Sequence, residues 1–357
     1  MKVLLTHERF MPDFGGGGEY IVEQTALHLA ARGVHVHVLT TGDPNLDNYQ
    51  GIPVTRMPIP RYRMNLMAGK IAKIAANSDL IHTFNYQACL PSLIAGARLR
   101  IPVVCTCLGL FGEAWLEMRG RLAGTAIRAW ERFLLTRPYA RMLFLSDYSQ
   151  RDGIALGIDP SRVAVACPGF PSATFSSDER EPLVLFAGKY EPRKGVFDVV
   201  AVARALPHVR FRMIGWGPEK EKLLQQAPPN LDVADKKTGD DYCRELARAS
   251  IFFLPSKAET FGIALAEAMA SGCAVVSSIP LEFEGVRVRA GDVGGMVEAV
   301  QRLWLSPAEC RSAGQRNIKL AEQYTWTRYT DALMQTYLDV LAHRQAPAGM
   351  TGAAACL

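Results

Sequence analysis

The first half of the chain alternates short apolar runs with longer segments whose apolar residues recur at helical spacing. The short runs predict buried strands at 3–5, 34–39, 79–81, 102–105, 142–145 and 163–165. Segments with helical spacing lie near 21–30 and 86–99. Because strands that alternate with helices form parallel sheets covered by those helices, this half predicts an α/β domain.

The alternation breaks between residues 167 and 182, a stretch rich in Pro, Gly, Ser and charged residues that is typical of a linker. Strand-like runs then return, and a last helical segment follows near 326–343. We therefore expect two doubly wound Rossmann-like domains facing across a cleft. The predicted boundaries are 1–170 for the first domain, 171–182 for the linker, 183–325 for the second domain, 326–345 for a helix packing back toward the first domain, and 346–357 for a flexible tail.

Length and composition fit two globular cores. The chain has 357 residues, of which 49% are hydrophobic and 21% charged, and this excludes a largely disordered protein. No apolar stretch reaches about 18 residues, and the first strand begins at once, so we expect neither a membrane span nor a cleavable signal. The eight cysteines lack Cys-x-x-Cys spacing, so we interpret them as reduced core residues of a cytoplasmic protein and expect no zinc site.

The excess positive charge lies in the first half of the chain. Residues 1–170 hold 18 Lys and Arg against 13 Asp and Glu, whereas residues 171–357 hold 22 against 22. Any acidic ligand should therefore meet the first half. The basic residues are not interleaved with aromatic ones, so we expect no nucleic-acid partner.

The strongest chemical signal lies at 255–272, where a strand ends, a short loop follows and a helix begins near Phe261. The first N–H groups of a helix are unpaired and carry partial positive charge, so this helix end could hold phosphate. Glu259 precedes the helix and Glu267 follows eight residues later. Carboxylates beside a phosphate site are suited to accept hydrogen bonds from hydroxyls such as those of a sugar and a ribose.

This segment resembles the E-x7-E signature of the family-4 retaining glycosyltransferases, which have the GT-B fold. The resemblance covers nearly the whole chain. Residues 79–82 (Asp-Leu-Ile-His) are similar to the family's D-V-V-H strand, 188–195 to its G-R-x-x-x-x-K-G loop, and 214–218 to its V-G-x-G-P turn. The E-x7-E block is the specific element, and the others gain weight from their order.

The resemblance implies a nucleoside-diphosphate sugar as the donor. Gly16 and Gly17 match the glycine pair whose backbone approaches the diphosphate, and four consecutive glycines after a first strand favour the same role. Lys194 matches the lysine that holds the diphosphate. Lys189 stands where the family usually carries Arg, so we expect Arg193 to share the task.

The remaining donor contacts come from the same comparison. Glu259 would contact the transferred sugar and Glu267 the ribose hydroxyls. Gly188 opens the lysine loop, and backbone N–H groups would come from Phe261, Gly262 and Ile263. The first domain would then serve the acceptor and the second the donor.

Two positions depart from the family pattern. Leu108 replaces the His of a T-x-H-G turn, which suggests a less polar contact near the sugar's 6-position and a donor lacking the 6-hydroxyl or seated differently. Phe84 replaces the second His of H-x-H, and the loop at 279–285 is shortened. The candidates for contacts with the sugar or the acceptor are His82, Asn85, Leu108 and Gly109.

The family chemistry implies retention of the anomeric configuration, with protein cations stabilising the leaving nucleotide in place of a metal. The chain has no Asp-x-Asp sequence, so we expect no metal site and no cofactor beyond the nucleotide sugar, with UDP favoured over GDP. No nucleophilic carboxylate can be picked out. The acceptor hydroxyl could belong to a glycan, a glycolipid or a small molecule.

The region 115–137 is a basic amphipathic stretch with five arginines. It fits an ordinary connecting helix whose apolar face packs on its own sheet, and it also fits peripheral contact with an anionic membrane at its inner face. For the chain as a whole, two alternatives stay open, a nucleotide-sugar epimerase on the same scaffold and a non-catalytic nucleotide- or glycan-binding relative. A dinucleotide dehydrogenase is disfavoured because residues 15–18 lack G-x-G-x-x-G.

Overall fold

The structure is a computed structural model that describes residues 1–13, 16–170 and 180–345. It divides into two compact units. The first comprises Met1–Gly109, Arg132–Ala166 and the helix α13 (Trp326–Gln345), and the second comprises Leu110–Glu131 and the chain from Cys167 to Thr325. Residues 180–182 are the only described part of the predicted linker, and the predicted tail lies outside the described residues. The predicted boundaries also differ from this division at Leu110–Glu131 and at 167–170, which group with the second unit.

The first unit is built on an eight-stranded sheet in the order β3-β4-β2-β1-β5-β6-β7-β8. All neighbouring strands are parallel except the pair β3·β4. Val3, Leu4 and Leu5 of β1 are almost fully buried, as the apolar run predicts. The strands are β1 (Lys2–Thr6), β2 (His35–Thr41), β3 (Asn48–Tyr49), β4 (Ile52–Met57), β5 (Leu80–Phe84), β6 (Val103–Cys107), β7 (Arg141–Phe144) and β8 (Val163–Val165).

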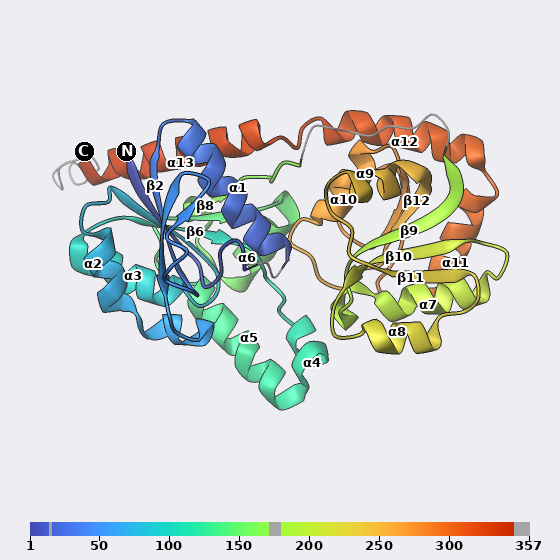
Figure 1. Cartoon of the computed structure of the whole chain (residues 1–357), viewed down its shortest axis with the longest axis horizontal. Helices are drawn as coiled ribbons and strands as arrows, with labels where there is room; N and C mark the ends of the chain where they lie inside the picture. Colours follow the sequence, from blue (N-terminus) through green and yellow to red (C-terminus); the bar gives the residue numbers. More distant parts are fainter. Residues whose placement is uncertain (14–15, 171–179, 346–357) are drawn as a thin grey trace, which may run out of the picture. The chain divides into compact units, whose positions relative to one another are not determined.

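Helices cover both faces of this sheet (Figure 1). α1 lies beside α13 on one face, and α2 packs against α3 on the other. Two contacts tie α13 to the unit, a 2.8 Å hydrogen bond between the hydroxyls of Thr25 and Tyr329 and an ion pair between Arg32 and Asp331 at 2.7 Å. The helices are α1 (Gly17–Ala31), α2 (Ala68–Ala75), α3 (Cys89–Leu99) and α6 (Asp147–Leu156), with the 3-10 turns η1 (Arg61–Leu66) and η2 (Pro160–Arg162).

The second unit holds a six-stranded parallel sheet in the order β11-β10-β9-β12-β13-β14. In Figure 1, α9, α10 and α12 lie on one face of it and α7 and α8 on the other. Its strands are β9 (Glu181–Lys189), β10 (Phe211–Trp216), β11 (Leu231–Asp235), β12 (Ala249–Leu254), β13 (Ala274–Ser277) and β14 (Gly285–Arg287). Its helices are α7 (Val196–Ala205), α8 (Lys220–Gln226), α9 (Gly239–Arg248), α10 (Ile263–Ala270), α11 (Val293–Trp304) and α12 (Pro307–Ala321), with the turn η3 (Pro192–Lys194).

Two parallel-sheet α/β units confirm the predicted fold class. The unit boundary falls within α5 (Arg121–Leu135), which follows the short helix α4 (Ala114–Arg119). Among the described residues, no helix combines the length and apolar character needed to cross a bilayer. The seven described cysteines form no disulfide, and five of them are buried.

Candidate functional site

The three cations predicted for the site lie on one short segment of the second unit. Lys189 is the last residue of β9, and Arg193 and Lys194 belong to η3. Because β9 and β12 are neighbouring parallel strands, the loops that follow them leave the same edge of the sheet. The backbone N–H of Lys257, in the loop after β12, donates to the Arg193 carbonyl at 2.8 Å. The structure therefore brings the lysine loop against the segment that carries Glu259.

Gly195 allows this approach of the two loops. Its φ is 69°, in the left-handed region that glycine adopts without strain. A Cβ at this position would lie 2.2 Å from the Pro255 carbonyl oxygen, so a larger residue would push the loops apart. The close approach of the two loops therefore requires a glycine at the end of the lysine loop.

Lys194 and Glu259, predicted from motifs 65 residues apart, form an ion pair. The Ser256 hydroxyl donates to the same Glu259 oxygen at 3.2 Å. Burial acts to raise the pKa of Glu259, but the charges of Lys194 and Arg193 outweigh it and hold the pKa below its usual value. Burial lowers the pKa of Lys194, and Glu259 opposes that change. Both groups are mostly buried, with exposed side-chain fractions of 16% and 10%.

Glu191 organises the other two cations. One of its carboxylate oxygens lies 2.6 Å from Lys189 Nζ, and the other accepts from Arg193 Nε at 3.0 Å. Burial acts to raise the pKa of Glu191, and these two cations reverse the effect and lower it. The sequence analysis assigned Glu191 no role, although this residue lies inside the lysine loop, residues 188–195. The cluster holds three cations against two carboxylates, so it keeps a net positive charge.

Glu267 lies on α10 and has a different environment. It accepts a hydrogen bond from the Tyr242 hydroxyl at 2.7 Å. Burial raises the pKa of Glu267 to about 7, although the tyrosine hydrogen bond acts in the opposite direction. This carboxyl therefore changes its charge near neutral pH. Tyr242 was not identified from the sequence, because nothing in its local pattern marks a contact 25 residues away.

The N-terminus of α10 begins two residues later than predicted, at Ile263. Gly262 precedes it with φ 87°, and no side chain caps the helix, so its first N–H groups have no side-chain acceptor. The Phe261 side chain is 2% exposed and packs edge-on against Tyr324 with ring centroids 5.1 Å apart. Phe261 can thus offer a ligand its backbone, while its ring belongs to the core.

The segment Leu110–Glu131 packs on the lysine loop, which the sequence did not predict. The Arg193 guanidinium lies 5.1 Å from the centroid of the Phe111 ring, and Lys257 pairs with Glu117 at 2.9 Å. The buried carboxylate of Glu131 accepts from the backbone N–H groups of Phe111 and Gly112 at 3.0 and 2.8 Å. These contacts fix the position of the Arg193 side chain.

In the first unit, the structure places the glycine pair at the start of α1. Gly16 is the N-cap and Gly17 the first helical residue, while Gly15 lies outside the described residues. Leu108 lies close by, because a Cβ on Gly18 would be 3.3 Å from its Cδ1 atom. The position that departs from the family pattern is thus next to the glycine loop, and its contact with the donor stays a prediction.

The other candidates of the first unit have structural contacts. His82 is fully buried, with Nε2 2.7 Å from the Thr106 hydroxyl and Nδ1 bonded to the Tyr337 hydroxyl, and burial lowers its pKa to about 3. The structure therefore does not place His82 where a ligand could reach it. Asn85 holds the turn at Leu108, donating to the Gly109 carbonyl at 2.6 Å and accepting from the Leu108 N–H at 2.7 Å.

Two family models match the chain. The "Glycosyl transferase 4-like domain" model matches residues 15–169, and the "Glycosyl transferases group 1" model matches residues 181–306, so together they match well over half of the chain. The curated relatives include D-inositol 3-phosphate glycosyltransferases. The protein of Mycobacterium leprae is 25% identical, with 91% of this chain and 88% of the relative covered. The protein of Rhodococcus opacus is 24% identical, with 91% and 86% covered.

Solved structures share the fold. Sucrose-phosphate synthase from Thermosynechococcus elongatus has a TM-score of 0.79 at 20% identity, covering 96% of this chain and 99% of that one. Anabaena HepE in complex with UDP-glucose has a TM-score of 0.79 at 18% identity, covering 95% and 100%. With both family models matched in order on two parallel-sheet units, the chain belongs to the family-4 glycosyltransferases of the GT-B fold.

Proposed function

We propose that this glycosyltransferase moves a sugar from a nucleoside-diphosphate sugar, with UDP as the nucleotide rather than GDP, to an acceptor hydroxyl. The anomeric configuration is retained, and no metal ion is required. The observation that carries the proposal is the gathering of Lys189, Arg193, Lys194 and Glu259 beside the uncapped N-terminus of α10.

The cationic cluster supplies positive charge that stabilises the departing nucleoside diphosphate. As the bond from the anomeric carbon to the diphosphate oxygen breaks, negative charge grows on the diphosphate. Lys194 and Arg193 are held in place by Glu259, by Glu191 and by the Phe111 ring, so little reorganisation is needed when that charge appears. The acceptor oxygen bonds to the anomeric carbon on the face that the leaving group vacates, and its proton passes to the leaving diphosphate.

The two carboxyls of the E-x7-E block divide the recognition of hydroxyls. Glu259, ionised beside Lys194, accepts from the hydroxyls of the transferred sugar. Glu267 accepts hydrogen bonds from the ribose hydroxyls and does so best when it is ionised. Because its pKa is about 7, the ionised form predominates above neutral pH. Support for UDP comes from HepE, whose structure contains UDP-glucose.

A donor screen tests this proposal. Purified protein is mixed with UDP-, GDP- and TDP-sugars in the presence of EDTA, and its melting temperature and the release of free sugar are measured. We expect stabilisation by UDP and slow hydrolysis of one UDP-sugar. Stabilisation without any turnover, in the presence of varied acceptors, would favour the non-catalytic relative, and inversion of the sugar on an intact nucleotide would favour the epimerase.

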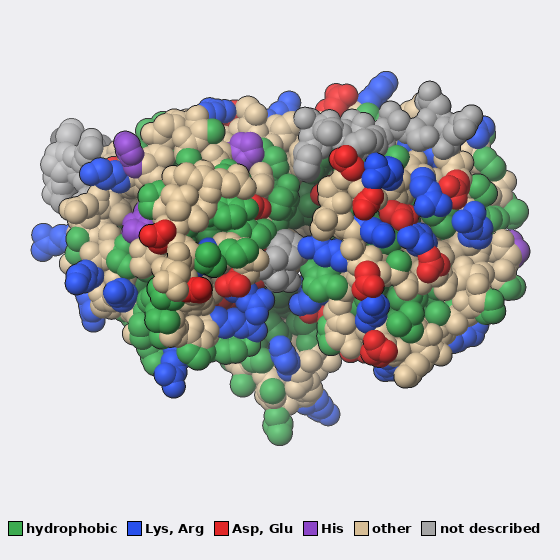
Figure 2. Space-filling model, viewed as in Figure 1, with side chains coloured by type: hydrophobic (Ala, Val, Ile, Leu, Met, Phe, Trp, Pro, Cys, Tyr) green, Lys and Arg blue, Asp and Glu red, His purple; other side chains and the backbone are tan. Residues whose placement is uncertain are grey.

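We also propose that α5 rests on an anionic membrane surface. Leu122, Trp130 and Phe133 are exposed by 92%, 39% and 40% on this helix, among three arginines, Arg121, Arg128 and Arg132. Its sole acidic residue, Glu131, is 1% exposed and engaged with backbone N–H groups, so the helix itself exposes no acidic side chain. Arg128 pairs with the exposed Glu113 at 2.5 Å, so the positive charge of this face comes mainly from Arg121 and Arg132. Figure 2 shows basic and hydrophobic side chains together over the α4–α5 hairpin, at the bottom of the view.

Vesicle sedimentation tests the membrane contact. We expect binding to vesicles that contain phosphatidylglycerol, weaker binding to pure phosphatidylcholine, and loss of binding at high salt. Leu122→Ser should weaken binding, whereas Leu224→Ser, which changes a leucine exposed by 47% on α8, should not. Equal sedimentation with both lipids, or equal effects of both variants, would contradict the contact.

A further inference from the structure

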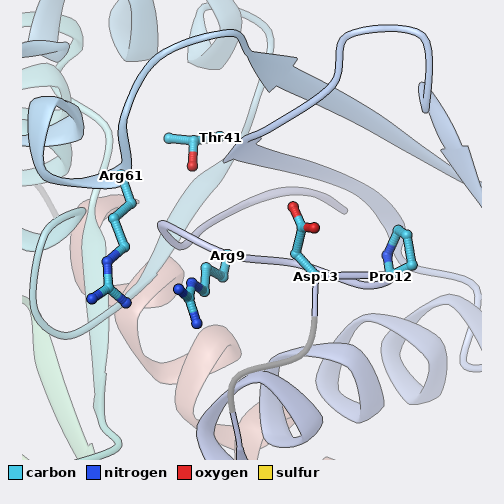
Figure 3. A pocket seen from close by; sticks show the side chains of 5 residues that line it. All are labelled: Arg9, Pro12, Asp13, Thr41 and Arg61. Atoms are coloured by element: carbon cyan, nitrogen blue, oxygen red, sulfur yellow. The ribbon is translucent and has the colours of Figure 1, made fainter.

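A cavity of about 570 Å³ opens at the strand ends of the first unit. Arg9, Pro12, Asp13, Thr41 and Arg61 line it (Figure 3). Arg9 follows β1, Thr41 ends β2 and Arg61 follows β4, and these three strands are neighbours in the sheet. The cavity therefore lies where parallel α/β sheets bind ligands, at the carboxyl ends of the strands.

The two arginines bring positive charge that the described protein leaves unneutralised. Figure 3 shows the side chains of Arg9 and Arg61 extending from two different segments toward the same side of the cavity. Neither guanidinium forms an ion pair with any described residue. Arg61 donates to the Tyr62 hydroxyl and lies 4.6 Å from the centroid of that ring, which leaves its other N–H groups available.

One acidic side chain, Asp13, lines the same cavity, and it lies beside the buried Arg56. A Cβ on Gly42 would lie 3.0 Å from Asp13 Oδ2 and 3.7 Å from an Arg56 nitrogen, so the Asp13 carboxylate lies beside Arg56. Burial lowers the pKa of Arg56, and the charge of Asp13 opposes that change. A carboxylate oxygen of Glu8 lies 3.5 Å from His7 Nε2. Neither carboxylate pairs with Arg9 or Arg61.

Arg56 holds the loop that carries Arg9 in place. It is 4% exposed, and its guanidinium donates to the backbone carbonyls of Leu46, Phe10 and Met11, the first two at 2.8 and 3.1 Å. The Thr41 hydroxyl donates to the Glu8 carbonyl at 2.7 Å. These bonds hold both ends of the loop from Glu8 to Met11, so the backbone that carries Arg9 is preorganised for binding.

We infer that this cavity binds an anionic group of the acceptor, a phosphate or a carboxylate, through Arg9 and Arg61. Planar guanidinium groups match the oxygens of such anions in bidentate geometry, and an anion relieves the repulsion between two cations that share a cavity. The inference rests on the proposed glycosyl transfer and names the chemical class of its acceptor. A neutral glycan would leave both arginines unpaired.

Binding of inorganic phosphate to the full chain, measured by calorimetry, tests the site without a known acceptor. Arg9→Gln and Arg61→Gln should each weaken phosphate binding about tenfold to a hundredfold, the effect of losing a charged hydrogen bond. Arg63→Gln, which changes an exposed arginine on the same turn η1, is the matched control and should bind as wild type does. If one glutamine variant fails to fold, the other, together with Arg9→Lys, still reports on the site.

A matched set of sugars shows whether the anionic group of the acceptor is a carboxylate or a phosphate. Glucose, glucuronate and glucose 6-phosphate differ only at the sixth carbon, and binding of glucuronate or of the phosphate ester, but not of glucose, would identify the anion. The same variants are then titrated with UDP. Unchanged UDP binding is expected, since the arginines serve the acceptor.

Three results would overturn the inference. These are anion binding that is equal in all variants, absence of anion binding to wild type, or UDP binding that falls as much as phosphate binding, which would assign the cavity to the donor. Failure of the proposed function itself would look different, since no nucleotide sugar would bind or turn over while Arg9-dependent anion binding could persist.

Discussion

The two units handle positive charge in opposite ways. In the second unit, Lys189, Arg193 and Lys194 are each paired with a carboxylate of the same cluster. In the first unit, Arg9 and Arg61 face a cavity and form no ion pair with any described residue. Paired cations are fixed in position before a ligand arrives, whereas unpaired cations are left for a ligand to neutralise.

The difference matches two tasks. A site that must stabilise charge arising during a reaction benefits from donors that are already oriented, because reorganisation then adds little to the barrier. A site that only selects a partner benefits from an unsatisfied charge, because a partner lacking the opposite charge leaves it unpaired. We therefore expect changes in the second unit to act on turnover and changes in the cavity to act on acceptor binding.

The largest effect should come from Lys194→Ala. The charge of this lysine matters most when the diphosphate leaves, so turnover should fall on the order of 10² to 10³, with a smaller change in donor affinity. Steady-state kinetics with the donor found in the screen measures both quantities. Lys220→Ala, which removes a lysine paired with Asp235 in the same unit, is the control. If Lys194→Ala turns over as wild type does, the cluster does not stabilise the leaving group.

Glu267→Ala should act on binding rather than on turnover. Losing hydrogen bonds to a charged group costs about 1–3 kcal/mol, so the affinity for the nucleoside diphosphate should drop about fivefold to 150-fold. Calorimetric titration with UDP measures the change. Tyr242→Phe, which removes only the protein's own hydrogen bond to this carboxyl, is a milder comparison and should raise the Glu267 pKa further, because that bond lowers it. If the affinity of Glu267→Ala for UDP equals that of wild type, Glu267 does not bind the ribose hydroxyls.

Donor affinity should depend on pH through the same residue. The Glu267 pKa is raised to about 7, so the carboxyl is largely neutral below that pH and ionised above it. Affinity for a UDP-sugar, whose diphosphate does not titrate in this range, should therefore rise about tenfold from pH 6 to pH 8. Glu267→Gln cannot ionise and should show a flat profile. A parallel rise in this variant would place the titrating group elsewhere.

The smallest effect should come from Leu108→His. If the leucine beside Gly18 favours a donor without a 6-hydroxyl, the variant should shift preference toward a hexose donor over its 6-deoxy analogue by about 1 kcal/mol, the value of one hydrogen bond. Competition between the two donors measures the shift. A strong preference of wild type for the 6-hydroxylated sugar would contradict the premise.

Local patterns were sufficient to predict the fold. Apolar runs such as 3–5 and 142–145 are buried in the structure because parallel strands covered on both faces must be continuously apolar. Gly195, the glycine that ends the lysine loop, could also be predicted from the sequence motif. The structure gives the reason, because its backbone conformation and its contact with Pro255 leave no room for a side chain.

Non-local contacts were not predictable in the same way. The sequence suggested that His82 could touch a ligand, but the side chain is enclosed between Thr106 and Tyr337, the latter 255 residues away. The cavity at Arg9 and Arg61 depends on three strand ends meeting, and Leu110–Glu131 groups with the second unit through contacts such as that of Phe111 with Arg193. Such contacts leave no periodic trace in the sequence.

The most direct test of the central claim is the rate of donor hydrolysis by wild-type protein in EDTA compared with added Mg²⁺. If protein cations stabilise the leaving diphosphate, the rate should be the same under both conditions. Hydrolysis that stops in EDTA and returns with Mg²⁺ would show that a metal ion stabilises the leaving group, and the role proposed for Lys194 and Arg193 would be wrong.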